Sequence, residues 1–157
     1  MGFCVYKFLK GWQPTPTFRA MIGCGAERTL ISSLIPPDVT HINGVQGNAF
    51  RSSMELCNTS IITTSLVADF YIKTTGRGNL HGTWTTLPRI SKNLTGLSRI
   101  LSLNCLSNSY SLLWSENFES SFNLMVWSQP SNHRLPNDFW ANLTPEWTRD
   151  CALRTDY

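Results

Sequence analysis

Basic and aromatic residues interleave through the middle of the chain, where residues 70–115 carry five basic side chains and no acidic one. A hairpin in this region would place cations beside aromatic rings, an arrangement that holds single-stranded nucleic acid by stacking and by attraction to phosphate. The candidate nucleic-acid-binding residues are Lys73, Arg77, Trp84, Arg89 and Lys92. The alternative is a hairpin with solvated basic edges, which discourage association between strands.

A search for catalytic spacing identifies no nucleophile motif. The chain contains no GxSxG elbow, no HExxH pattern and no SxxK pattern. An unrecognised catalytic site would most simply involve His81 and Asp69, but their spacing matches no known triad. We therefore assign no catalytic residue and expect a non-enzymatic protein, with an enzyme that uses an unrecognised site as an alternative hypothesis.

The cysteines and histidines are scattered along the chain. The five cysteines are separated by 20 to 48 residues, and no Cys-x-x-Cys pair or Cys–His cluster occurs. Structural zinc sites need such close spacing, so we expect no metal site, and no sequence motif indicates a cofactor. Single scattered cysteines are typical of buried thiols in a reducing compartment.

The N-terminus does not resemble a secretory signal peptide, because Lys7 and Lys10 interrupt its short apolar run. No apolar run reaches the roughly 18 residues that a transmembrane helix needs. We therefore expect a cytoplasmic or nuclear protein. The alternative is a secreted protein glycosylated at the sequons of Asn58, Asn93 and Asn142.

The composition fits one domain with little charge on its surface. The chain has 157 residues, a charged share of 15% and a formal net charge of +3, whereas a charged share of about 25% is usual. Six Trp and eight Phe supply apolar bulk, which excludes a highly charged disordered tail. In the absence of catalytic spacing, these features favour an interaction or regulatory protein that binds a protein partner through an apolar and aromatic surface.

The local patterns predict a small α+β domain built on a β-hairpin. Residues 59–75 are dense in β-branched and aromatic types and predict a strand, with a partner strand over 80–87. Helical spacing of apolar residues predicts short helices over 26–35 and 90–106. The second of these segments also shows the alternation of a strand near its end.

Further segments are shorter or less regular. Asn43-Gly44 predicts a hairpin turn and residues 118–127 predict a strand. We expect a single domain over 1–157, with residues 1–17 and 128–157 rich in loops or loosely attached. Phe139, Trp140 and Trp147 are expected to pack back on the core. Because several local signals disagree, the alternative is an incompletely folded chain with isolated elements.

Overall fold

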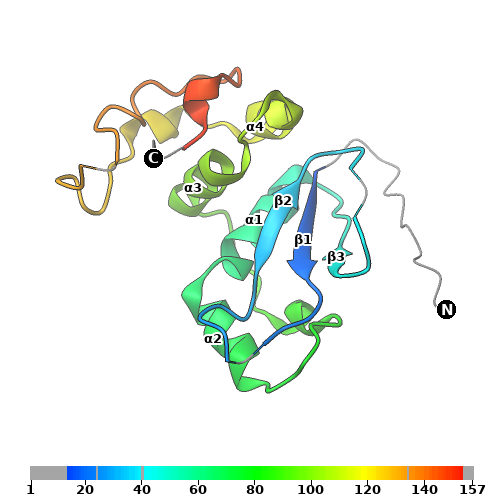
Figure 1. The fold of residues 1–157 in the computed structure, drawn as a ribbon. Helices are drawn as coiled ribbons and strands as arrows, with labels where there is room; N and C mark the ends of the chain where they lie inside the picture. Colours follow the sequence, from blue (N-terminus) through cyan, green and yellow to red (C-terminus); the bar gives the residue numbers. More distant parts are fainter. Residues whose placement is uncertain (1–13, 24, 40, 134, 154–157) are drawn as a thin grey trace. The chain divides into compact units, whose positions relative to one another are not determined.

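The computed structural model describes residues 14–23, 25–39, 41–133 and 135–153. The chain divides into two compact units, residues 1–91 and 92–157, which are described separately. A small antiparallel sheet and four α-helices occur in the described residues (Figure 1), and they confirm the α+β class expected from the sequence. The expectation of a single domain stays a prediction.

The first unit is built around a three-stranded antiparallel sheet (Figure 1). Strand β1 (Thr15–Arg19) lies in the centre, between β2 (Ser32–Ile35) and β3 (Val45–Gly47). Residues 15–17, which the sequence assigned to a loose end, are therefore buried in the central strand. The rest of that predicted end, up to residue 13, lies outside the described residues.

Two helices occupy the segment for which a strand was predicted. They are α1 (Ser53–Thr63) and α2 (Leu66–Thr74), so the hairpin expected over 59–87 is wrong. Both the buried and the exposed faces of α2 carry large apolar side chains. A helix that is apolar all round lacks the 3.6-residue period of an amphipathic helix, and its β-branched residues then resemble a strand.

Both helices begin at a serine whose side chain accepts a hydrogen bond from the first turn. Ser52 Oγ accepts from the backbone nitrogen of Glu55 at 3.2 Å, and Ser65 Oγ accepts from that of Ala68 at 3.1 Å. Such caps satisfy backbone donors that have no partner within the helix. The Ser-x-x-Glu pattern at 52–55 is typical of a helix start, and the strand prediction overlooked it.

The segment after α2 does not form the predicted partner strand. Residues 78–80 instead bond to the chain that follows β1, where Ile22 N donates to Gly78 O at 3.0 Å and Leu80 N donates to Ala20 O at 2.9 Å. The chain then forms a short 3₁₀ helix, η1 (Thr83–Thr86). The turn into it places Gly82 at a φ of +77°, a conformation that suits glycine.

The helix predicted over 26–35 is also wrong, because this segment is a loop followed by β2. Pro36 restricts Ile35 to an extended conformation, which suits a strand rather than a helix. The predicted turn at Asn43-Gly44 is confirmed, since Val45 N donates to Ile42 O at 3.0 Å. The strand that follows pairs with β1, so no local hairpin forms there.

The first unit has its core between the sheet and the two helices. The buried apolar residues are Phe18, Ile22, Leu30, Ala68, Ile72, Leu80 and Leu87, with Ile62 and Trp84 packed against them. Helix α1 contacts both β1 and β2. The core therefore joins elements that lie up to about 70 positions apart in the sequence.

The second unit contains helices α3 (Leu94–Asn104) and α4 (Ser111–Asn117). The helix predicted over 90–106 is confirmed, and it begins at an Asn93 cap that accepts from Gly96 N at 2.8 Å. The strand predicted over 118–127 is wrong, because its residues form the 3₁₀ helix η3 (Ser120–Leu124). Two more 3₁₀ turns are η2 (Asn108–Tyr110) and η4 (Arg149–Cys151).

The chain between η3 and η4 is irregular but packs on the core of the second unit. Phe139 and Trp140 are buried, as the sequence predicts. Trp147 is partly buried and donates from Nε1 to the carbonyl oxygen of Cys105 at 2.8 Å. None of the helices formed by the described residues is long and apolar enough to cross a membrane.

Candidate functional site

The first unit contains a cavity of about 400 Å³ between α1 and the chain around the end of η1. Helix α1 contributes Glu55, Asn58, Thr59, Ile62 and Thr63, and the opposite wall contains Trp84, Thr85, Leu87, Pro88, Arg89 and Ile90, with Phe50 completing the lining. Small-molecule sites commonly have volumes of about 300–1,000 Å³ and combine an apolar lining with a few polar groups. The cavity has both properties.

Trp84 is fixed in the wall of this cavity by two other rings. It stacks on Phe18 with a centroid distance of 5.3 Å and lies tilted against Phe50 at 6.1 Å. Phe18 belongs to β1 and is buried, so the sheet positions the indole. The Nε1 atom of Trp84 is buried and has no hydrogen-bond partner in the described part of the chain.

Asn58, on the α1 side of the lining, carries a second unpaired polar atom. Its Oδ1 is buried and accepts no hydrogen bond from any described residue. A buried donor or acceptor without a partner costs about 1–3 kcal/mol. Both residues line the cavity, but the unpaired atoms themselves are covered by protein.

Two charged side chains of opposite sign complete the polar part of the lining. Glu55 and Arg89 are exposed, and neither forms an ion pair with another described residue. A ligand in the cavity can therefore meet a cation and an anion beside the apolar side chains of the lining.

The predicted nucleic-acid-binding residues are distributed between this cavity and other contacts. Trp84 and Arg89 line the cavity. Lys73 Nζ donates to the carbonyl oxygen of Ala26 at 2.9 Å. The structure thus places one of the predicted lysines against the loop before β2.

The other two predicted residues have partners of their own. Arg77 donates to the hydroxyl of Thr83 at 3.2 Å. Lys92 belongs to the second unit, where it forms an ion pair with Glu119. The cavity therefore unites Trp84 and Arg89, and the nucleic-acid role of the full set stays a prediction.

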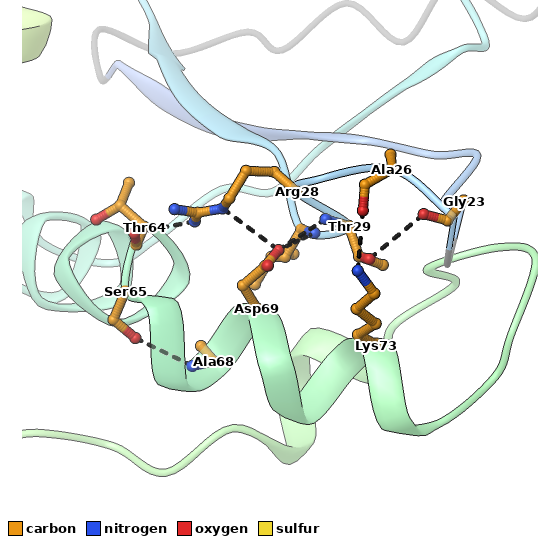
Figure 2. Close-up of polar contacts among 10 residues, drawn as sticks. Gly23, Ala26, Arg28, Thr29, Thr64, Ser65, Ala68, Asp69 and Lys73 are labelled. Atoms are coloured by element: carbon orange, nitrogen blue, oxygen red, sulfur yellow. Dashed lines mark hydrogen bonds and ion pairs between the residues drawn. The ribbon is translucent and has the colours of Figure 1, made fainter.

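Asp69 holds the loop before β2 against α2, as Figure 2 shows. Its Oδ1 accepts from the backbone nitrogens of Thr29 at 2.8 Å and Leu30 at 2.6 Å, and it lies 3.5 Å from Arg28 Nε. The carboxylate is 5% exposed and is occupied by these contacts. No hydrogen bond or ion pair between described residues joins it to His81, so the geometry gives Asp69 a structural role.

Helix α2 has an apolar face that is turned to solvent. Leu66 is 71% exposed, Val67 81%, Phe70 69% and Tyr71 46%. With 3.6 residues per turn, these four side chains cover a continuous arc of roughly 140°. We call these four residues the α2 face. The opposite side of the helix packs on the core through Ala68 and Ile72.

Sequence reasoning missed both Asn58 and the α2 face. Asn58 lines the cavity as part of helix α1, and the four residues of the α2 face share one side only because their segment is a helix. The serine caps at 52 and 65 were the available signals, since each precedes a helix in the structure.

Titratable groups give little indication of catalysis. Within the described ranges, no group of three or more His, Cys, Asp or Glu residues is arranged to hold a metal ion. Burial, and secondarily the neighbouring Cys105, raises the pKa of Tyr110 in the second unit above its usual 10.0. This shift keeps the phenol neutral and does not create an acid or base that works near neutral pH.

No protein-family model matches the chain, and comparisons with curated proteins and with solved structures found no match. Function is therefore inferred from the chain's own residues. Two features stand out in the first unit, which are the cavity and the α2 face.

Proposed function

We propose that the protein is a non-enzymatic interaction protein that binds a partner protein through the α2 face. The observation that carries this proposal is the exposure of Leu66, Val67, Phe70 and Tyr71 on one nine-residue helix. Contiguous exposed apolar patches of this kind are typical of interaction sites. Burying one such side chain contributes about 1.5–3 kcal/mol before the costs of association are subtracted.

The α2 face is presented by a helix that is anchored on its other side. Ile72 is fully buried and Asp69 bonds the loop before β2. The Ser65 cap fixes the start of the helix. A partner therefore meets a preformed surface, which reduces the ordering entropy that binding costs.

The charges near α2 indicate the chemistry of the partner. Lys73 and Arg77 follow the α2 face in the chain and keep their positive charge while Lys73 donates to Ala26 O and Arg77 to Thr83. The acidic residue of the helix, Asp69, is buried. An apolar surface with a basic edge is complementary to an amphipathic helix whose apolar side chains are flanked by Asp or Glu. We take an acidic amphipathic helix as the partner.

The proposal is tested with a displayed library of helical peptides. Each peptide carries Leu or Phe at positions i, i+3, i+4 and i+7, with Glu, Asp, Lys, Arg or Ala at the remaining positions. We expect selection on the full chain to enrich peptides with Glu and Asp beside the apolar stripe. Selected peptides should bind at least tenfold more weakly to a Val67→Ser/Phe70→Ser double variant.

The matched control is Ile42→Ser, which changes an apolar residue of the first unit that is 66% exposed and lies outside α2. This variant should bind the selected peptides as the unchanged chain does. Selection without acidic enrichment, or equal binding to the double variant, would contradict the proposal. Binding of anionic vesicles or single-stranded RNA through the same residues, or self-association through them, would also contradict it.

The compartment belongs to the same proposal. We place the protein in the cytoplasm or nucleus, where its partner would be found. The buried thiol of Cys151 forms no disulfide, which suits a reducing environment.

A further inference from the structure

We infer that the cavity of the first unit binds an uncharged, mainly apolar molecule of about two fused rings. The inference is independent of the α2 face. It starts from what the polar residues of the lining leave available to a ligand. Most of their polar groups are paired within the protein, covered by it or balanced in charge, so the surface that remains for a ligand is apolar.

Two threonines of the lining use their hydroxyl groups within their own helical turns. Thr63 Oγ1 donates to the carbonyl oxygen of Ser60 at 3.3 Å, and Thr85 Oγ1 donates to that of Gly82 at 2.7 Å. Neither hydroxyl proton is therefore left for a ligand. The unpaired Oδ1 of Asn58 is covered by protein and is equally out of reach.

The two charged residues of the lining offset each other. Glu55 and Arg89 carry opposite formal charges, and both are exposed. An ion bound beside them would be attracted by one and repelled by the other, and contact with water weakens both effects. The lining therefore favours neither an anion nor a cation. An uncharged ligand also avoids the cost of removing a charge from water.

The remaining side chains of the lining are apolar and come from both walls. They are Phe50, Ile62, Trp84, Leu87, Pro88 and Ile90. The ring of Trp84 is held by its stack on Phe18 at 5.3 Å, so this part of the wall is formed before a ligand arrives. Aromatic side chains pack on flat rings through offset or edge contacts, which favours a planar ligand.

The volume of the cavity sets the size of the ligand. An apolar protein cavity of about 150 Å³ holds one benzene ring, and the cavity beside Trp84 has a volume of about 400 Å³. Two fused rings with a small substituent therefore fit. A helix, whose diameter with side chains is about 10 Å, is too wide to enter. The occupant is thus a small molecule and not a partner helix.

The test is a titration of the full chain, with isotope-labelled isoleucine methyl groups, by the uncharged two-ring alcohol 2-naphthol. We expect a dissociation constant of about 0.1 mM or tighter. The methyl resonances of Ile62 and Ile90, which line the cavity, should shift. Those of Ile31 and Ile42, which are exposed elsewhere in the first unit, should not. Inositol, a polar ring that carries a hydroxyl on every carbon, should shift none of them.

Charged analogues test whether the lining selects a charge. 2-Naphthoate carries a carboxylate and 2-naphthylmethylamine carries an ammonium group on the same ring system. Because Glu55 and Arg89 are exposed and opposite in sign, neither ion should bind more tightly than 2-naphthol. An ion that bound more than about tenfold tighter than 2-naphthol would overturn the uncharged class.

Two variants change the site at residues that are not fully buried. Thr59→Phe fills the cavity from α1 and should weaken the binding of 2-naphthol by about tenfold or more. Ile90→Ala removes apolar surface from the opposite wall and should weaken it about fivefold. The matched controls lie outside the lining, and they are Met54→Phe on α1 and Ile42→Ala. Both should bind 2-naphthol as the unchanged chain does.

Three further results would overturn the inference. The first is that 2-naphthol leaves the methyl resonances of Ile62 and Ile90 unchanged, or shifts those of Ile31 and Ile42 equally. The second is that Thr59→Phe and Met54→Phe bind 2-naphthol with equal affinity. The third is that inositol binds as tightly as 2-naphthol, which would identify a polar site. Failure of the peptide selection would leave this inference untouched, because the two surfaces share no residue.

Discussion

Three tryptophans of the second unit and Trp84 of the first unit use their N–H groups in opposite ways. In the second unit, Trp114, Trp127 and Trp147 donate to backbone carbonyl oxygens at 2.8, 3.0 and 2.8 Å. In the first unit, Trp84 has a buried Nε1 and no acceptor among the described residues. The difference follows from which groups pair the backbone of each unit.

The second unit has an irregular chain whose backbone must be paired by other means. Asn123 Nδ2 lies within 3.1 Å of the carbonyl oxygens of residues 140, 141 and 143, and the three indoles act in the same way. The first unit has a sheet for this purpose, together with the carboxylate of Asp69. Its indole donor is therefore not needed to hold the chain.

Trp140 shows that an unpaired indole alone does not define a binding site. Its Nε1 is also buried without a described partner, but its ring packs against Trp127 at 4.7 Å and Phe139 at 5.0 Å. It does not line the second unit's cavity of about 320 Å³. Trp84 differs because its side chain lines a cavity of the first unit, although its Nε1 atom is itself covered.

The largest expected effect comes from removing the anchor of the first unit. Asp69→Ala leaves the buried N–H groups of Thr29 and Leu30 without acceptors, so we expect the first unit to lose about 3 kcal/mol of stability. Native-state hydrogen exchange measures this loss at the amides of α1 and α2. The amides of α3 should keep their protection.

The control for this change is Glu27→Ala, which removes an exposed carboxylate from the same loop. It should alter stability by less than about 0.5 kcal/mol. Equal losses in the two variants, or equal losses in both units, would contradict the anchoring role of Asp69.

The next effect concerns the side chain that holds the irregular segment of the second unit. Asn123→Ala removes the amide that lies against three carbonyl oxygens, and we expect a loss of about 2 kcal/mol. Limited proteolysis should then cleave within residues 128–146 more rapidly. Asn137→Ala, which changes an exposed asparagine of the same segment, should leave the cleavage rate unchanged. An unchanged rate in both variants would show that the aromatic packing alone holds the segment.

The sequence predicts local structure well where one face of a segment is apolar, and poorly elsewhere. In α3, the spacing of Leu94, Leu97 and Leu101 predicts the helix correctly. In α1 the buried face includes Ser60 and Thr63, whose hydroxyls donate to carbonyl oxygens of their own helix. Polar residues paired in this way interrupt the 3.6-residue spacing of apolar residues from which a helix is predicted. The class of fold was thus predictable, whereas the position of the sheet was not.

The candidate site was less accessible to sequence reasoning than the fold. Trp84 and Arg89 were singled out for their chemistry, and both line the cavity. No sequence motif marks Asn58, because it lines the cavity only through the helix that it belongs to, together with residues about 26 to 32 positions later. Pairings at such separations are set by tertiary packing, which local patterns do not encode.

A smaller effect tests the contrast between the indoles directly. Trp147→Phe removes a donor that is paired with Cys105 O, whereas Trp84→Phe removes a donor without a partner. Both changes reduce the volume of the ring, so their difference isolates the hydrogen bond. We expect the paired position to lose about 1 kcal/mol more than the unpaired one in chemical denaturation. Equal losses would contradict the contrast between a paired and an unpaired indole N–H.

The smallest effect concerns pH and only the second unit. Because the pKa of Tyr110 is raised above its usual 10.0 by burial and by Cys105, the folded state disfavours the phenolate. The resulting stability is fully present below about pH 10 and is lost as the pH rises through the folded pKa. Tyr110→Phe should therefore flatten the alkaline decline in stability of α3 and α4, followed by hydrogen exchange. Tyr71→Phe in the first unit is the matched control and should leave that decline unchanged. If the Tyr110→Phe decline is as steep as that of the unchanged chain, other groups drive the alkaline unfolding of this unit.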